Sequence, residues 1–308
     1  MKTLAVIDIG SNTLLVTVGR RQDDGSTRIL CDEGEVTRLG QGLSDGGELQ
    51  PDAKARALKA LARFKELALA KGAQRILAAG TAAFRRARDG AGFAAEIQDK
   101  LGFPVRILSG DEEAHYSFAS AWHDFGAGRA SLGMIDIGGG STEFVFGREG
   151  PRFSLPMGTV KLTERLVRGH PIRDAEWSAV LAEIRRLLQE NLGNVQARPG
   201  AWAAVAATPA SLAAVLQQLP AYDPEKVHGF RLKLFALEGL VESLRGKSLA
   251  ERRAMPGMHP DRAELLPVGG AILLEAMKFL GVEEILVSDH GLRYGILYEN
   301  LSGRFTSS

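Results

Sequence analysis

The sequence has almost no cysteine, no long apolar run and almost no net charge. Its single cysteine, Cys31, has no partner for a disulfide within the chain, which agrees with a reducing compartment, and we expect the cytoplasm. We expect no membrane-spanning helix, because no stretch of about 20 apolar residues occurs. The first apolar run meets Asp8 after a few residues, which is not typical of a signal peptide. The net charge of +1 excludes an overall field that would attract nucleic acid or a membrane.

What remains is typical of a globular α/β protein. The 308 residues are enough for two ordinary domains, and 36 glycines against 12 prolines indicate many tight turns. Short apolar runs alternate with segments of helical periodicity, which favours the α/β class. We expect one domain at residues 1–124 and a second at residues 125–308, with a closing helix at 292–308 that could pack back on the first.

Two similar glycine turns organise the chain. Residues 8–13 read DIGSNT and residues 136–143 read DIGGGSTE, and each turn lies between two apolar runs. This pattern predicts a β-hairpin at the start of each half, and therefore mixed sheets. An Asp at a strand end, beside the backbone N–H groups of a turn, suits a metal-bound phosphate, because the carboxylate binds the cation and the amides bind the anion. The repetition predicts two similar domains that face each other across a cleft.

Charged residues gather at the ends of two further predicted strands. Three arginines follow the strand expected at 75–79: Arg85, Arg86 and Arg88. They could bind phosphate through paired N–H groups, or form a solvated helix face. Ser109 and Glu112 have capping-box spacing, which leaves Glu113 as the freer carboxylate. Glu113 could orient a water molecule for attack, or could be an ordinary acid in a first helical turn.

Other polar segments leave two interpretations open. Residues 39–43 could form a surface loop or fold over the first hairpin. His228 could be structural or lie in the cleft, and Asp289 and Arg293 could pair with each other or contribute polar groups at a strand end. His259 has no second His or Cys at metal-ligand spacing, so we expect no zinc site there.

In their order along the chain, these segments resemble the exopolyphosphatase and guanosine pentaphosphate phosphohydrolase (Ppx/GppA) family. That family lies within the superfamily of actin, Hsp70 and sugar kinases, whose domains are ribonuclease-H-like. Residues 8–13 and 136–143 are similar to its phosphate motifs, 81–85 to its interdomain arginine motif, and 109–114 to the segment with its proposed catalytic Glu. Similar segments at 227–229, 259–263 and 288–293 follow in family order, and the chain resembles a short, two-domain form.

The resemblance implies two actin-like domains and hydrolysis of the terminal phosphoanhydride of inorganic polyphosphate, with release of orthophosphate. It implies that Glu113 is the general base and acts with Asp136 and Glu143. Mg²⁺ or Mn²⁺ would be held by Asp8, Asp136 and Glu143. The implied phosphate-binding residues are Ser11, Asn12, Thr13, Gly138, Gly139, Gly140, Ser141, Thr142 and Arg85.

The substrate stays open between related phosphoanhydrides. The same groups could hydrolyse pppGpp to ppGpp, (p)ppGpp could act as an inhibitor, or the protein could be a sensor of polyphosphate or alarmone with low turnover. We expect a homodimer by analogy, and neither nucleic acid nor a membrane as partner. Two segments depart from the pattern of relatives. Ala206-Ala207 replaces the paired glycines of the adenosine-binding turn, which disfavours a kinase. Leu15 replaces a polar or basic residue just after the first glycine turn.

Overall fold

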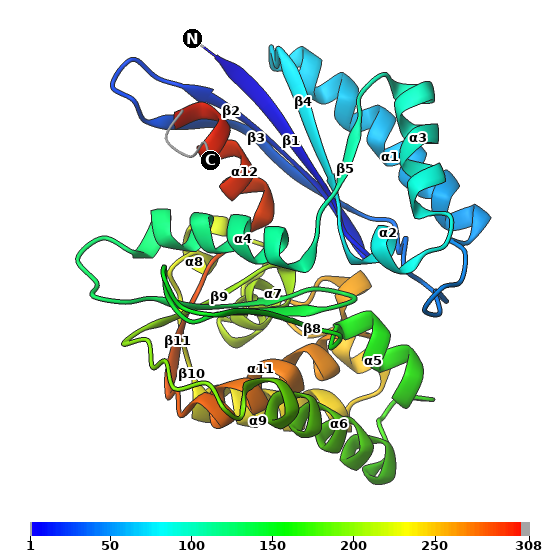
Figure 1. The fold of residues 1–308 in the computed structure, drawn as a ribbon. Helices are drawn as coiled ribbons and strands as arrows, with labels where there is room; N and C mark the ends of the chain where they lie inside the picture. Colours follow the sequence, from blue (N-terminus) through cyan, green and yellow to red (C-terminus); the bar gives the residue numbers. More distant parts are fainter. Residues whose placement is uncertain (1, 303–308) are drawn as a thin grey trace. The chain divides into compact units, whose positions relative to one another are not determined.

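The structure, a computed structural model, describes residues 2–302 and divides into two compact units. Among these residues, unit 1 combines 2–120 with 292–302, and unit 2 comprises 121–291. The chain passes from one to the other within helix α4 (Gly110–Phe125). Each unit contains a mixed sheet with flanking helices, so the predicted α/β class with two mixed sheets is confirmed (Figure 1). Within residues 2–302, every helix is too short or too polar to cross a membrane.

Unit 1 is built on a five-stranded sheet with the order β3-β2-β1-β4-β5. The strands are β1 (Thr3–Ile9), β2 (Thr13–Arg21), β3 (Thr27–Val36), β4 (Arg75–Gly80) and β5 (Val105–Ile107). The first three strands are antiparallel neighbours, as the hairpin pattern predicts. Strands β1, β4 and β5 are parallel neighbours, so their carboxyl ends lie at one edge of the sheet.

Helices cover both faces of this sheet because β1 is apolar on both sides. Its residues Ala5, Ile7 and Ile9 share a core with α1 (Pro51–Ala70) and α3 (Gly90–Leu101). Leu4 and Val6 pack instead with α12 (Leu292–Ser302). Successive side chains of a strand point to opposite faces, so α12 lies across the sheet from α1 and α3 (Figure 1). Burying each of the Leu, Ile and Val side chains contributes about 1.5–3 kcal/mol.

Unit 2 is built on a six-stranded sheet with the order β10-β11-β9-β6-β7-β8. The strands are β6 (Gly133–Ile137), β7 (Thr142–Val145), β8 (Arg152–Leu155), β9 (Trp202–Val205), β10 (Arg231–Lys233) and β11 (Glu284–Val287). Strands β6, β9 and β11 are parallel, whereas β7, β8 and β10 run antiparallel to their neighbours. The carboxyl ends of β6, β9 and β11 therefore lie at one sheet edge.

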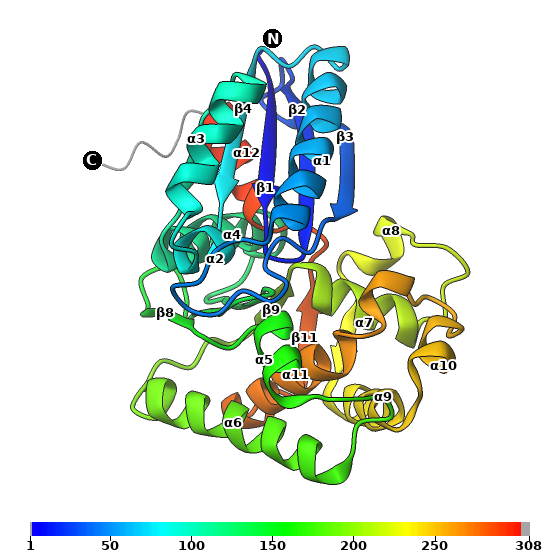
Figure 2. The same cartoon turned by 90° about the vertical axis from the view of Figure 1, so that its right-hand side faces the viewer.

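Helix α11 (Leu266–Leu280) is the centre of the helical layer of unit 2. All its residues from Leu266 to Met277 are buried, and it contacts α5, α6, α7 and α9 (Figure 2). The remaining helices of the unit are α5 (Thr159–Leu166), α6 (Asp174–Leu192), α7 (Ala207–Leu216), α8 (Pro224–Val227), α9 (Leu234–Gly246), α10 (Leu249–Arg253) and the 3₁₀ turn Pro260–Arg262. In unit 1, α2 (Ala82–Arg86) completes the set.

Candidate phosphate-binding and catalytic residues

The tip of the first hairpin is covered by the loop that follows β3. The β1–β2 register reaches Ile9 opposite Leu14, and the Gly10 N–H donates to the Thr13 carbonyl at 3.2 Å, so residues 10–13 form the turn. The Asn12 carbonyl accepts the N–H groups of Thr37 and Arg38 at 3.0 and 2.9 Å, and the Ser11 carbonyl accepts that of Gly40 at 2.7 Å. Leu39 is fully buried. The loop at residues 39–43 therefore folds over the first hairpin, which was one of its two interpretations.

Polar side chains are buried at this tip. Ser11 is 4% exposed and Asn12 is 6% exposed, and the Asn12 amide donates to the Thr13 hydroxyl at 3.3 Å. The Ser11 hydroxyl has no hydrogen-bond partner within residues 2–302. A buried hydroxyl without a partner costs free energy. A phosphate oxygen that accepted a hydrogen bond from Ser11 would remove this cost.

Unit 1 brings Asp8, Arg85 and Glu113 to a single sheet edge. Asp8 is half-buried near the carboxyl end of β1, opposite Ala79 of β4. Helix α2, with Arg85, follows β4 directly, and α4, with Glu113, follows β5. The carboxyl edge of parallel strands is where ligands bind in open α/β sheets. Asp8 near the end of a strand, and Arg85 and Glu113 on helices that follow two other strands, thus lie at the edge where such a site is expected.

Arg85 and Glu113 form an ion pair with each other. The Arg85 guanidinium contacts Glu113 Oε1 through Nη1, which also donates to the Leu108 carbonyl at 2.7 Å. The Glu113 side chain is 10% exposed and that of Arg85 is 26% exposed. Arg85 therefore balances the charge of Glu113. A guanidinium has five N–H donors, so Arg85 could hold Glu113 and a phosphate oxygen together.

Glu112 has the capping role that its spacing predicts. Its backbone N–H donates to the Ser109 hydroxyl at 3.1 Å, and its carboxylate accepts the Ser109 N–H at 2.8 Å. The hydrogen bond from the Ser109 backbone lowers the pKa of Glu112. Because Glu112 is used in this way, Glu113 is the carboxylate of the first turn of α4 that contacts Arg85.

The other two arginines of the cluster contact the loop before α1. Arg86 pairs with Asp45 at 2.7 Å, and Arg88 pairs with Glu48 at 2.6 Å. The Arg88 pair is largely exposed, so it contributes little to stability. Arg85 is thus the arginine of the three that contacts the candidate base.

The second hairpin is fixed by the amino end of α5. The Gly138 carbonyl accepts the Thr159 N–H at 3.0 Å, and the Gly139 carbonyl accepts those of Val160 and Lys161 at 2.9 and 3.1 Å. These bonds satisfy N–H groups that a helix start otherwise leaves unpaired. A side chain at Gly158 would place its Cβ 2.3 Å from the Gly139 carbonyl oxygen, so only glycine fits there. The glycine turn is therefore held rigidly.

Asp136 and Glu143 lie opposite each other in the β6–β7 register. Directly opposed residues of antiparallel strands project from the same face, with Cβ atoms about 5 Å apart. Glu143 is 2% exposed and accepts a hydrogen bond from the Ser154 hydroxyl at 2.7 Å, while Asp136 is half-buried. Two neighbouring carboxylates offer the oxygen ligands that Mg²⁺ and Mn²⁺ prefer. The donor set of unit 2 thus fits the expected cation.

The remaining polar residues of this turn are buried as well. Ser141 is 6% exposed and Thr142 is 0% exposed. The Thr142 hydroxyl donates to the Met157 carbonyl, so this hydroxyl fixes the turn to the segment before α5.

Ala206 has an unusual backbone conformation at the carboxyl end of β9. Its φ is +77° and its ψ is −177°, in a region of the backbone map that glycine usually occupies. The paired glycines expected in the adenosine-binding turn of the superfamily are thus replaced by an alanine that keeps a glycine-type conformation. Its methyl group occupies space at the sheet edge that bears Asp136.

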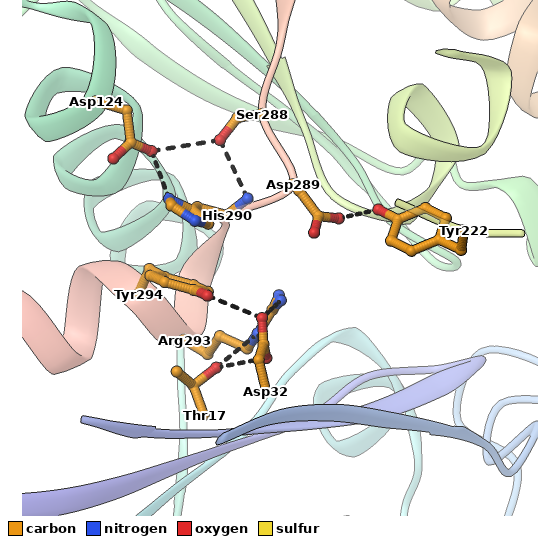
Figure 3. A network of polar contacts seen from close by, with 9 residues as sticks. All are labelled: Thr17, Asp32, Asp124, Tyr222, Ser288, Asp289, His290, Arg293 and Tyr294. Carbon is orange, nitrogen blue, oxygen red and sulfur yellow. Dashed lines mark hydrogen bonds and ion pairs between the residues drawn. The ribbon is translucent and has the colours of Figure 1, made fainter. Parts of the chain in front are cut away.

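Two polar networks were not predicted from the sequence (Figure 3). In unit 1, Asp32 accepts hydrogen bonds from Thr17, Arg293 and Tyr294 at 2.8–3.0 Å. In unit 2, Tyr222 donates to Asp289, and Asp124 contacts His290 and His228. The partners are separated by tens to hundreds of residues, so no local spacing could reveal them.

Comparisons with known proteins agree with the geometry. The sequence model described as the Ppx/GppA phosphatase family matches residues 18–303. Exopolyphosphatase 2 of Mycobacterium tuberculosis is 32% identical over 95% of this chain and 97% of its own. The guanosine-5′-triphosphate,3′-diphosphate pyrophosphatase of Vibrio cholerae is 28% identical over 96% of this chain but 58% of its own. The crystal structure of the Aquifex aeolicus Ppx/GppA family member is 27% identical, with a TM-score of 0.83 and coverage of 99% of both chains.

These matches define a class of protein, an actin-like α/β phosphatase with two mixed sheets, and confirm the predicted fold class. The chain belongs to the Ppx/GppA phosphatase family.

Proposed function

We propose that this protein is an exopolyphosphatase, which hydrolyses the terminal phosphoanhydride bond of inorganic polyphosphate and releases orthophosphate. The observation that carries the proposal is the Asp136–Glu143 carboxylate pair beside the rigid glycine turn of unit 2. The likeness to exopolyphosphatase 2 of Mycobacterium tuberculosis over nearly the full length of both chains supports the same substrate class.

The two hairpins have different roles in this proposal. Phosphoryl transfer requires mainly positioning and neutralisation of charge. The triple-glycine turn, Gly138–Gly140, and Ser141 would bind the terminal phosphate through backbone N–H groups and a hydroxyl. In unit 1, Ser11, Asn12 and Thr13 would bind a phosphate of the same chain, which is consistent with the buried Ser11 hydroxyl.

Glu113 would act as the general base for the attacking water. Its ion pair with Arg85 supports an ionised carboxylate held at the carboxyl edge of the unit 1 sheet. Arg85 would donate hydrogen bonds from some of its guanidinium N–H groups to a substrate phosphate, while others keep Glu113 oriented. Arg85 is then both a phosphate-binding residue and a positioning residue for the base.

The cation of the reaction would be Mg²⁺ or Mn²⁺, held by Asp136 and Glu143 of unit 2 and by Asp8 of unit 1. When bound, such a cation neutralises charge on the phosphate oxygens. The oxygen-only donor set of Asp136 and Glu143 supports this assignment. A homodimer and a cytoplasmic location complete the proposal. Neither nucleic acid nor a membrane is a proposed partner.

A substrate panel tests the proposal. Orthophosphate release would be measured with Mg²⁺ for polyphosphates of several lengths, pppGpp, ATP and pyrophosphate. The expected result is the highest kcat/KM with polyphosphate. A higher kcat/KM with pppGpp would assign the protein to the alarmone branch instead, and saturable binding of polyphosphate without release would make it a sensor.

A further inference from the structure

Three residues of unit 2 that take no part in the proposed reaction converge around a single point. Asp124 lies in the last turn of α4, His228 directly follows α8, and His290 lies in the loop after β11. His290 Nδ1 is 2.9 Å from Asp124 Oδ2, and His228 Nε2 is 4.0 Å from the same oxygen. One ligand atom from each of the three residues lies within 4.8 Å of the others (Figure 3 shows Asp124 and His290).

Backbone hydrogen bonds hold the two histidines in place. The Gly229 N–H donates to the Val287 carbonyl and the Ser288 N–H donates to the Ala204 carbonyl, both at 2.8 Å. The loops that carry His228 and His290 are thereby joined at the carboxyl end of β11. The Phe125 ring stacks on His228 with a centroid distance of 5.1 Å, and the two imidazoles are 4.3 Å apart. The three side chains are therefore arranged before any ligand binds.

The pKa shifts of Asp124 and His228 agree with a site for a divalent metal ion. Burial raises the pKa of Asp124, but hydrogen bonds from His123 and His290 and the charges of the histidines outweigh this and lower it to about 2. Burial and the neighbouring His290 lower the pKa of His228, which favours the neutral imidazole that binds metals. The cluster thus combines an ionised carboxylate with imidazole nitrogen.

The ligand types select the metal. Zinc binds His nitrogen and Asp oxygen at about 2.0–2.2 Å, so tetrahedral ligand atoms lie about 3.3 Å from one another. The observed separations of 2.9 and 4.0 Å lie on either side of this value, so small side-chain movements would close the site. Mg²⁺ prefers oxygen ligands and would not select this cluster.

We propose that Asp124, His228 and His290 bind Zn²⁺ or a divalent transition metal ion of similar preference, with a fourth position open to solvent. The site is separate from Asp136 and Glu143, because β9 lies between β11 and β6. Two strand spacings correspond to about 10 Å. The bound ion joins the end of α4 to the loops after α8 and β11, so it stabilises unit 2. This inference is independent of the proposed function.

Metal uptake by the full chain without an affinity tag tests the inference. The protein would be stripped with a chelator and then titrated with Zn²⁺ in buffer with excess Mg²⁺, which fills oxygen-only sites. The expected result is one Zn²⁺ per chain by elemental analysis and a higher Tm with Zn²⁺, because a ligand that binds only the folded state stabilises it. Substitution by Co²⁺ should give the visible absorption of a low-coordinate site with nitrogen ligands.

Single substitutions locate the ion. His228→Ala and His290→Ala should each weaken Zn²⁺ binding by about tenfold or more. His259→Ala is the matched control, because His259 is an exposed histidine of the same unit outside the cluster, and it should bind like the wild type. Asp136→Asn should also keep the uptake. The inference is overturned if the wild type shows no saturable uptake, or if both cluster variants bind Zn²⁺ as tightly as His259→Ala does. If one variant does not fold, the wild-type stoichiometry and the other variant still decide.

Discussion

Replacing Glu113 with glutamine separates its proposed role as a base from its role in an ion pair. Glutamine has nearly the same shape and keeps an oxygen that can accept a hydrogen bond from Arg85. It cannot accept a proton from the attacking water. The substitution therefore removes the chemistry of a general base and preserves most of the packing around the 10%-exposed side chain.

The two roles predict effects of different size. A charge-assisted hydrogen bond is roughly twice as strong as a neutral one, so the loss of charge should reduce the free energy of unfolding by about 1 kcal/mol. In a chain of 308 residues, that lowers Tm by about 1–2 °C. Loss of the base should lower kcat by about 10² or more, which corresponds to at least about 2.7 kcal/mol in the barrier. The KM for polyphosphate should not rise, because the substitution removes no proposed contact to the substrate and takes away a negative charge beside a polyanion.

The assay is steady-state release of orthophosphate from polyphosphate with Mg²⁺, together with thermal unfolding of the same preparations. Glu112→Gln is the matched control. Glutamine also completes a capping box, and the ion pair of Glu112 with Arg106 is largely exposed, so this variant should keep kcat and lose no more than about 1 kcal/mol of stability. A wild-type kcat in Glu113→Gln would remove Glu113 from the mechanism. A large fall in Tm with a proportional loss of active protein would show that the ion pair is only structural.

Three further predictions concern the rigidity of the site and the stability of each unit. Gly158→Ala should lower both turnover and stability, because its new Cβ would collide with the glycine turn. Gly169→Ala is the control: no atom lies within 4 Å of its new Cβ, so its free energy of unfolding in urea should stay within about 0.5 kcal/mol of the wild type. Equal stability of the two variants would refute the close approach at Gly158. Ala206→Gly should raise the free energy of unfolding by about 1 kcal/mol. The backbone strain at Ala206, about 1–3 kcal/mol, exceeds the entropy cost of a glycine at this position. A less stable variant would contradict this prediction. Burial raises the pKa of Asp32, but the charge and hydrogen bonds of Arg293, with Tyr294 and Thr17, outweigh it and hold that pKa below its usual value. A carboxyl pKa that is lowered by folding adds stability at pH values above the unfolded pKa of about 3.9, and this stability is lost as the pH falls. The wild type should therefore be more stable than Asp32→Asn at pH 7 and should lose part of this advantage in acid. A stability difference that does not change with pH would refute the assignment.

Most of the fold follows from local patterns in the sequence. The apolar runs on either side of each glycine turn form β1–β2 and β6–β7 as predicted, and the segment that begins at Pro51 forms α1. Strands β8 and β10 were not predicted. They have four and three residues without a continuous apolar run, and they exist because β7 and β11 offer them backbone partners.

The candidate site divides in the same way. The turns and the capping box are local, so their spacing predicts them. The Arg85–Glu113 ion pair joins two helices that meet only because β4 and β5 are parallel neighbours. The two residues can therefore be predicted from the sequence, but their contact cannot. The Asp124–His228–His290 cluster depends on three distant connections, which metal-ligand spacing cannot detect. Residues of local motifs are thus visible in the sequence, whereas sites that the topology of the sheets assembles are not.

The most direct test of the proposed function follows the lengths of polyphosphate chains during hydrolysis with Mg²⁺. Gel electrophoresis of the polymer would be combined with a measurement of free orthophosphate at each time point. The account predicts that orthophosphate is the small product from the earliest times, that chains shorten from their ends, and that Glu113→Gln nearly abolishes both. Shorter polyphosphate chains that appear without a matching amount of orthophosphate, or no orthophosphate above the level of Glu113→Gln, would contradict it.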